Sequence, residues 1–153
     1  MLGARDYFFR SRLNAWFFRT FFRILPLDRH GDFGSGLSLA QEVMKDGHPL
    51  LIYPEGTRSS DGQVHSFRPG VGLLGVELGV PIVPCLIQGT FTSLPKRKWW
   101  PKRAQVSVTF GQPMDMDDFR AQLSEMSRSR LYRQISSDLY RRVVSLADAS
   151  SSS

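Results

Sequence analysis

Apolar residues recur along the carboxyl-terminal part of the chain at the spacing of a helix. From position 119 onward they follow one another at intervals of mostly three to five residues, which predicts helices over residues 117–147 with a break near Ser127. Residues 148–153 offer no large apolar side chain to bury, so we expect a disordered tail there. The residues that carry the helical pattern are Phe119, Leu123, Met126, Leu131, Ile135, Leu139, Val143 and Leu146.

The middle of the chain contains three candidate strands. Residues 50–53 and 80–87 are short apolar runs suited to buried strands, and prolines interrupt the second run. Residues 105–110 alternate polar and apolar positions and include β-branched side chains, which is typical of a third strand.

Helical signals separate these strands. Ser35 is a candidate cap for a helix over residues 35–46 that ends at Gly47, and Pro69 suits the first position of another helix, over residues 70–78. Alternating strands and helices predict an α/β fold with a mixed, partly parallel sheet flanked by helices. Ligands of such sheets usually meet the loops at the carboxyl ends of strands, so the loop after residue 53 is the first place to look for a site.

Residues 4–23 interleave aromatic side chains with arginines. Arg5, Arg12 and Arg19 recur every seven residues and Arg23 follows four later, so a helix would gather them in one stripe and leave most of its surface apolar. Two interpretations remain open: a core helix with snorkelling arginines, or a helix in a bilayer interface. The apolar residues are Phe8, Phe9, Leu13, Trp16, Phe17, Phe18, Phe21 and Phe22.

Composition and charge narrow the classes of protein. The 153 residues suit one domain, and no run reaches the roughly 18 apolar residues that a membrane-spanning helix needs. The formal net charge of +6 and the pI near 10.0 favour an anionic partner. The single cysteine, Cys85, excludes an intramolecular disulfide, and no secretory signal is visible, so we expect a reducing compartment. With three histidines beside that cysteine, the sequence predicts no metal site.

The loop after residue 53 concentrates groups that can hold a phosphate. Gly56 permits close backbone approach, Thr57 and Ser59 carry hydroxyl groups, and Arg58 carries a guanidinium fork suited to an oxyanion. Glu55 can orient an arginine or accept a hydrogen bond from a substrate hydroxyl. Taken alone, this string is consistent with a plain turn or with a ligand site.

Three ordered blocks resemble the glycerolipid (lysophospholipid) acyltransferase family. Residues 53–59, Tyr-Pro-Glu-Gly-Thr-Arg-Ser, resemble its third block; residues 25–29, Leu-Pro-Leu-Asp-Arg, its second; and residues 80–85, Val-Pro-Ile-Val-Pro-Cys, its fourth. The sequences Phe-Arg-Pro-Gly at 67–70 and Phe-Gly-Gln-Pro at 110–113 also fit the family. The resemblance covers about residues 4–115.

The resemblance implies a glycerol-phosphate acyltransferase-like fold and a role in phospholipid biosynthesis. The reaction would move a fatty acyl group from acyl-CoA or acyl carrier protein, as co-substrate, to a hydroxyl of a lysophospholipid such as 1-acyl-glycerol 3-phosphate, with no bound cofactor. Arg29 and Arg58 match arginines implicated in gripping the acceptor phosphate. The acceptor-binding loop would comprise Glu55, Gly56, Thr57 and Ser59, while Pro81 and Pro84 would shape the acyl-donor side.

The family's catalytic first block, His-x4-Asp, is missing from this sequence. The residues five positions after His30, His48 and His65 are serine, tyrosine and glycine. We therefore expect residues 1–147 to form a partial, amino-terminally truncated acyltransferase domain, with helix 4–23, core 24–115 and helices 117–147. The alternative is a non-catalytic lipid- or phosphate-binding remnant. His30 and His65 are candidates for a substitute base, and exposed loop positions are the simpler interpretation of both.

A basic loop with two tryptophans precedes the third strand. Tryptophan prefers the headgroup zone of a bilayer and cations favour anionic lipid, so we expect peripheral contact with the cytoplasmic face of an anionic membrane. The alternative is a solvated basic loop with its tryptophans folded inward. Nucleic-acid binding is a further alternative without a recognisable motif, and we expect no nucleic acid as partner. The predicted membrane contacts are Lys96, Arg97, Lys98, Trp99 and Trp100.

Overall fold

The computed structural model describes residues 2–4, 25–27, 33–45, 47–95 and 100–150. The chain divides into two compact units, Met1–Tyr53 and Pro54–Ser153, which are considered separately. Several predictions lie outside the described residues: the aromatic and arginine helix beyond Ala4, the second-block Arg29, and the stretch from Lys96 to Trp99.

The first unit contains a short parallel ladder and one helix. Strand β1 (Leu2–Ala4) pairs with β2 (Leu25–Leu27), with Leu2 opposite Leu25 and Ala4 opposite Leu27. These three-residue strands are too short to show an alternating pattern, and the sequence did not predict them. Helix α3 (Phe33–Lys45) begins two residues before Ser35, so the prediction of Ser35 as its cap is wrong. Gly47 follows the helix with φ of 73° and donates its amide to the Met44 carbonyl oxygen at 3.0 Å.

The expected strand over residues 50–53 is absent from the structure. The segment is irregular, and the side chains of Leu51 and Tyr53 are 44% and 48% exposed. A strand requires a hydrogen-bonded neighbour, and none of the described strands pairs with this segment. The strand predicted from this apolar run is therefore wrong, because the segment has no strand to pair with among the described residues.

In the second unit, helix α4 (Gly70–Leu78) has the predicted bounds. Pro69 stands one position before the helix, as its N-cap with φ of −60°, rather than at the first helical position. At the other end Gly79 adopts a left-handed conformation and donates its amide to the Gly75 carbonyl oxygen at 3.0 Å. The fixed φ of proline and the freedom of glycine set the two ends of this helix.

Strands β3 (Cys85–Gln88) and β4 (Ser107–Phe110) form an antiparallel ladder. In its register Cys85 lies opposite Phe110 and Ile87 opposite Val108. β3 covers only the end of the run expected over 80–87, because the prolines confine the earlier pairing to an isolated bridge between Ile82 and Met114. A short helix, α5 (Thr90–Ser93), follows β3. With the parallel β1–β2 pair, the sheet content is mixed, in keeping with the predicted α/β class.

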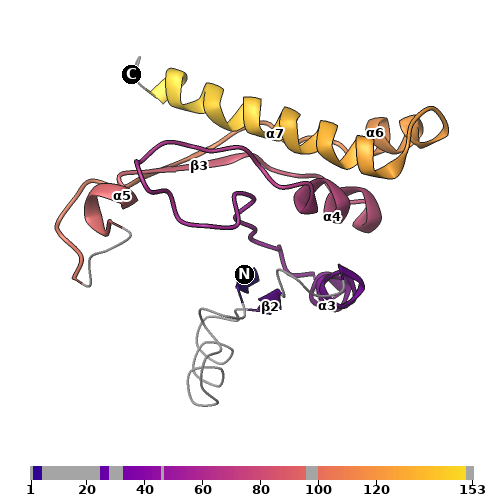
Figure 1. Cartoon of the computed structure of the whole chain (residues 1–153), viewed down its shortest axis with the longest axis horizontal. Coiled ribbons are helices and arrows are strands. Elements are labelled where there is room, and N and C mark those ends of the chain that lie inside the picture. Colours follow the sequence, from indigo (N-terminus) through magenta and orange to yellow (C-terminus); the bar gives the residue numbers. More distant parts are fainter. Residues whose placement is uncertain (1, 5–24, 28–32, 46, 96–99, 151–153) are drawn as a thin grey trace. The chain divides into compact units, whose positions relative to one another are not determined.

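The carboxyl-terminal segment is helical beyond the predicted limit. It comprises α6 (Asp117–Ala121), the 3-10 turn η1 (Gln122–Ser124) and the long helix α7 (Arg128–Ser150), with the break near Ser127 as expected. Helix α7 extends three residues into the segment expected to be a disordered tail, so the tail prediction is wrong for residues 148–150. Figure 1 shows α7 running along β3 and α4 within this unit.

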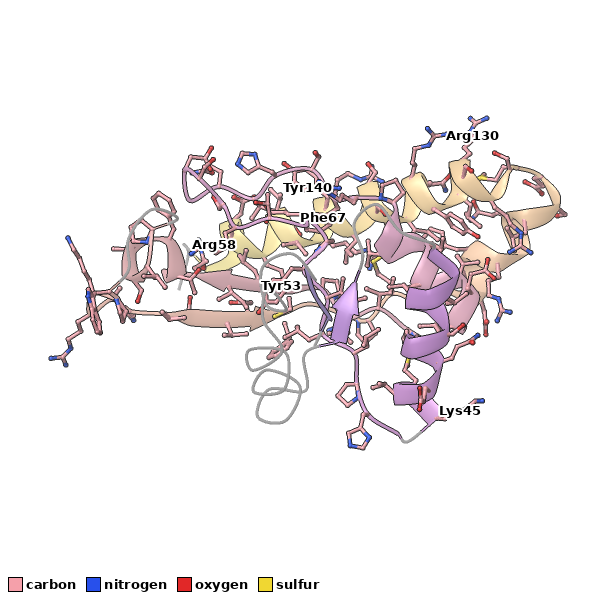
Figure 2. The ribbon with its side chains drawn as sticks, turned by 60° about the horizontal axis from the view of Figure 1, so that its bottom comes forward. Lys45, Tyr53, Arg58, Phe67, Arg130 and Tyr140 are labelled. Carbon is pink, nitrogen blue, oxygen red and sulfur yellow. The ribbon has the colours of Figure 1, made fainter. Side chains whose placement is uncertain are left out.

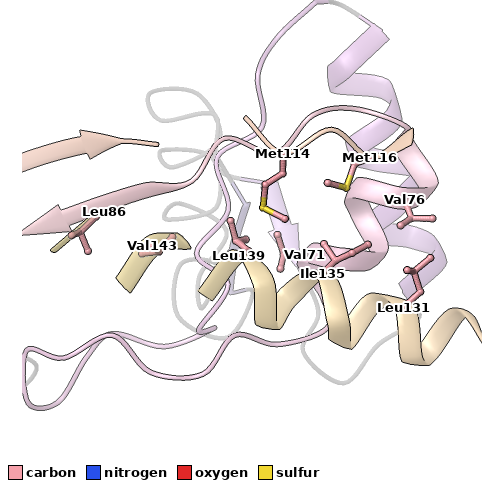
Figure 3. Packing of buried hydrophobic residues seen from close by; sticks show 9 residues of the cluster. All are labelled: Val71, Val76, Leu86, Met114, Met116, Leu131, Ile135, Leu139 and Val143. Carbon is pink, nitrogen blue, oxygen red and sulfur yellow. The ribbon is translucent and has the colours of Figure 1, made fainter. Parts of the chain in front are cut away.

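The core of the second unit lies between α7 and the elements that pack against it, among them α4 and β3 (Figure 3). Gly72 brings α4 and α7 into close contact, because a methyl group at this position would come within 2.3 Å of the Tyr132 carbonyl oxygen. One side of the ladder is covered less well: Val108 and Phe110 on β4 are 52% and 70% exposed. The buried cluster consists of Val71, Val76, Leu86, Met114, Met116, Leu131, Ile135, Leu139 and Val143.

A polar cluster joins the same two helices at their edge. Glu77 on α4 accepts a hydrogen bond from the Tyr132 hydroxyl at 2.6 Å and forms an ion pair with Arg128, both on α7. The Tyr132 hydrogen bond, aided by Arg128, lowers the pKa of Glu77 from its ordinary value, and burial raises the pKa of Tyr132. The cluster therefore favours an ionised Glu77 in the folded protein.

Candidate phosphate-binding loop

The third-block residues lie in a loop that closes on itself. The amide of Arg68 donates a hydrogen bond to the Pro54 carbonyl oxygen at 2.9 Å, which brings the two ends of the loop 54–68 together. Between these ends the chain makes tight turns without regular secondary structure. The sequence placed this loop after a buried strand, whereas the structure closes it through this backbone hydrogen bond.

Gly56 occupies the turn at the start of the loop, with φ of 70°, a conformation that favours glycine. The Arg68 side chain lies directly against it: Nε would be 2.8 Å from a Cβ placed on Gly56, and it donates to the Glu55 carbonyl oxygen at 3.4 Å. Glycine is thus required here both for backbone conformation and for the close approach of an arginine.

The carboxylate of Glu55 bonds within the loop. Its Oε2 accepts a hydrogen bond from the backbone amide of His65 at 3.4 Å. The sequence suggested that Glu55 orients an arginine, and the structure shows that contact through its backbone carbonyl to Arg68 rather than through its carboxylate. Glu55 therefore stabilises the loop through two groups, its carboxylate and its backbone carbonyl oxygen.

Ser59 also serves the loop itself. Its Oγ donates to Asp61 Oδ1 at 3.1 Å and accepts the amide of Gly62 at 2.8 Å. Asp61 Oδ1 further accepts the Gln63 amide at 3.0 Å and lies 3.0 Å from His65 Nε2. The bond from the Gln63 amide is the largest of the effects that lower the pKa of Asp61. These bonds give Ser59 a structural role in shaping the turn.

Arg58 and Thr57 lie at the exposed side of the same turn. Both residues are exposed, and the Thr57 hydroxyl donates to the Arg58 carbonyl oxygen at 3.4 Å. Figure 2 labels Arg58 among the loop side chains. The structure thus brings residues 55–59 together on one compact turn, while the clamp predicted between Arg58 and Arg29 involves a residue outside the described part of the chain.

His65 is the histidine of the loop and was a candidate substitute base. Its imidazole is exposed and pairs with Asp61, which lies four residues earlier on the same loop. The pair differs from the family's His-x4-Asp block in both order and spacing, and it belongs to the hydrogen-bond network that shapes the turn. This placement favours the simpler interpretation, an exposed loop histidine.

Helix α7 contacts the carboxyl-terminal end of the loop. Ser136 is 2% exposed, and its single hydroxyl proton is shared between the Tyr132 carbonyl oxygen at 2.8 Å and the Arg68 carbonyl oxygen at 3.1 Å. The neighbouring Phe67 meets Tyr140 edge to face, with ring centres 5.6 Å apart (Figure 2). The sequence analysis missed Ser136 and gave Arg68 no role; the one signal was that Arg68 stands in the Phe-Arg-Pro-Gly sequence that fits the family.

The fourth-block prolines differ in their surroundings. Pro84 is fully buried and its carbonyl oxygen accepts the Gly111 amide at 2.9 Å, whereas Pro81 is exposed. Burial and this backbone hydrogen bond therefore give Pro84 a structural role. A role for either proline on the acyl-donor side stays a prediction.

The described end of the basic loop exposes its tryptophan. Trp100 is 84% exposed, so the alternative of an inward-folded tryptophan is wrong for this residue. The loop closes nearby through the amide of Lys102, which donates to the Ser93 carbonyl oxygen at 2.7 Å. Across the described ranges, we find no helix with both the length and the apolar character to span a bilayer.

Two proteins similar to this chain bear the same enzyme name. The chain is 32% identical over 81 residues to a 1-acyl-sn-glycerol-3-phosphate acyltransferase of Cocos nucifera, covering 53% of this chain and 26% of that protein. It is 37% identical over 59 residues to a chloroplastic enzyme of the same name from Arabidopsis thaliana, covering 39% and 17%. The chain thus spans about a quarter or less of these two relatives.

A solved structure and a family model agree with these relatives. The crystal structure of the 1-acyl-sn-glycerophosphate acyltransferase of Thermotoga maritima matches with a TM-score of 0.66 and 26% identity, covering 95% of this chain and 56% of that one. The model of the family described as Acyltransferase matches residues 1–88, which include the loop and its turn. More than half of the chain carries that family pattern, and the chain belongs to the Acyltransferase family.

Proposed function

We propose that this chain carries the acceptor-binding part of an enzyme that acylates 1-acyl-glycerol 3-phosphate in phospholipid synthesis. Proteins similar to it, from plants and from Thermotoga maritima, bear the name of that activity. The observation that carries the proposal is the turn at residues 55–58, where Gly56 removes side-chain bulk and Arg58 presents a cation. A lysophospholipid with a phosphate headgroup is the acceptor that this chemistry favours.

The reaction is acyl transfer from a thioester. The acceptor hydroxyl attacks the thioester carbonyl carbon, a C–O bond forms, the C–S bond breaks, and the hydroxyl proton ends on the thiol of CoA or of acyl carrier protein. The attack needs a general base, and the resemblance assigns that base to a His-x4-Asp block that the three histidines of this chain do not form. Binding the phosphate and supplying the base are thus separable tasks.

The chain is expected to work at a membrane surface, where its acceptor resides. Trp100 supports this proposal through its 84% exposure, and the exposed Lys102 and Arg103 follow it after Pro101. Lys96, Arg97, Lys98 and Trp99 complete the proposed contact. Liposomes with anionic lipid should bind the chain at low salt, and both high salt and Trp100→Ala should weaken binding. Binding that resists both changes would contradict a membrane role for this loop.

Phosphate binding is tested directly with glycerol 3-phosphate, a soluble ligand that carries the headgroup without the acyl chain. Arg58→Ala should weaken binding about tenfold, because it removes a charged hydrogen-bond donor. Arg133→Ala is the matched control: it removes the same charge from α7, where the guanidinium Nε bonds the Ser129 carbonyl oxygen of its own helix. Equal affinities for both variants would contradict a phosphate site at this turn.

Acyl transfer onto lysophosphatidate distinguishes an enzyme part from a non-catalytic remnant. Activity of the chain alone, assayed with acyl-CoA and with acyl carrier protein, is compared with activity after an upstream segment bearing His-x4-Asp is added. Activity gained only with that segment supports an acyltransferase part. Phosphate binding without activity in either form supports the remnant.

A further inference from the structure

Arg68 contacts the candidate turn at two points. Its amide closes the loop on the Pro54 carbonyl oxygen, and its Nε bonds the Glu55 carbonyl oxygen at 3.4 Å. The side chain runs under Gly56, where any Cβ would lie 2.8 Å from Nε. A guanidinium is therefore placed against the same turn that presents Arg58.

Helix α7 fixes the position of Arg68 from the core side. The buried Ser136 hydroxyl donates to the Arg68 carbonyl oxygen, and Phe67 packs edge to face on Tyr140. These contacts hold the backbone on both sides of the Arg68 amide. An arginine that is already held in place loses less conformational freedom when it binds a ligand, so its contribution to affinity is larger.

The chemistry of the side chain suits an oxyanion. A guanidinium has five N–H donors and the Glu55 bond uses one of them. Arg68 is exposed, and the planar fork of its guanidinium matches two phosphate oxygens. Of the neighbouring carboxylates, Glu55 accepts the His65 amide and Asp61 accepts the Gln63 amide, so both have bonds inside the loop.

We propose that Arg68 binds the acceptor phosphate together with Arg58, and that Ser136 is the positioning residue that holds Arg68 in place. This inference rests on the proposed function, because it adds a second cation within the described part of the site. It also gives α7, far along the chain from the loop, a defined role in substrate binding.

The experiment measures affinity for glycerol 3-phosphate by NMR titration of the whole chain at several salt concentrations. Arg68→Ala should weaken binding about tenfold and flatten the dependence of affinity on salt, since one cation is lost. Arg68→Lys should keep the salt dependence and recover part of the affinity. Ser136→Ala should weaken binding about threefold with unchanged salt dependence, and Arg133→Ala should leave both unchanged.

The outcomes separate this inference from the function on which it rests. If Arg58→Ala weakens binding as expected while Arg68→Ala does not alter it, the role of Arg68 is overturned and the proposed function stands. Weaker binding in Arg68→Ala with the salt dependence of the unaltered chain would show a purely structural role, which also overturns the inference. If the unaltered chain does not bind glycerol 3-phosphate at all, both proposals fail.

Discussion

The α4–α7 pair and the loop 54–68 are held by different forces. Between the helices lie fully buried apolar side chains such as Leu131 and Ile135, and Gly72 lets the two backbones meet. The loop contributes few apolar groups and is held by hydrogen bonds among Pro54, Glu55 and Arg68. Apolar burial is thus concentrated between the helices, whereas the proposed phosphate-binding residues lie in the loop, and Ser136 links the two.

Removing core volume should have the largest effect on stability. Ile135 is fully buried on α7, so Ile135→Ala should lower the free energy of unfolding by about 3 kcal/mol through lost burial and a residual cavity. Urea unfolding followed by circular dichroism measures this change. The control is Val108→Ala on the exposed side of β4, where a loss of less than about 1 kcal/mol is expected; equal losses would contradict the assignment of the core.

Adding volume between the helices should have the next largest effect. A methyl group on Gly72 would lie 2.3 Å from the Tyr132 carbonyl oxygen, so the helices of Gly72→Ala must separate. We expect a loss of about 2 kcal/mol, measured by the same urea unfolding. Gly47→Ala is the control for the backbone cost of replacing a glycine. A Cβ on Gly47 meets nothing within 4 Å, so only its φ of 73° opposes alanine. A smaller loss for Gly72→Ala than for Gly47→Ala would contradict the close helix contact.

The hydrogen bond between Ser136 on α7 and Arg68 in the loop should contribute less to the free energy of unfolding. Ser136→Ala removes the hydroxyl that donates to Arg68 and should cost about 1 kcal/mol. Hydrogen exchange should locate this loss: the Arg68 amide should exchange faster, while amides in the middle of α7 change little. Ser145→Ala is the control, because its hydroxyl bonds only the Arg142 carbonyl oxygen within the same helix among its described contacts. Uniformly faster exchange across α7 would show general destabilisation instead.

The Glu77 cluster should produce the smallest effect, visible as a pH dependence. Its folded pKa is lowered from the ordinary value of 4.5, so its contribution is present above that value and is lost as the pH falls through the lower folded pKa. Tyr132→Phe removes the hydrogen bond that contributes most to this shift. The variant should be less stable at neutral pH by under about 1 kcal/mol and should lose less stability on acidification. Parallel pH profiles of the two proteins would contradict this linkage.

Local signals in the sequence predicted the elements that depend on local chemistry. Helix α4 has the predicted bounds, although Pro69 stands one position before the place predicted for it, and the apolar spacing around Ile135 indicated α7. Strands were less predictable, because a strand depends on a partner elsewhere in the chain. The run at 50–53 has the composition of a strand but no ladder, whereas the strand Leu2–Ala4 has a ladder but no distinctive pattern.

The residues of the candidate site likewise differ in how far the sequence could predict them. The turn chemistry of Gly56 and the exposed cation Arg58 were visible as residue types in order. The role of Ser136 was not, because a serine beside Ile135 has the pattern of an ordinary polar position on a helix. Its burial and its bond to a carbonyl 68 residues away arise from the packing of α7.

The contact at Gly72 also bears on how the second unit opens in solution. Because the backbones of α4 and α7 touch there, neither helix can leave the other without exposing apolar side chains of both. The two helices should therefore open in a single cooperative step, with their slowest amides sharing one opening free energy, whereas amides of the turn at 55–62 open separately and at lower cost. On this expectation, the proposed phosphate-binding turn would open without the helices.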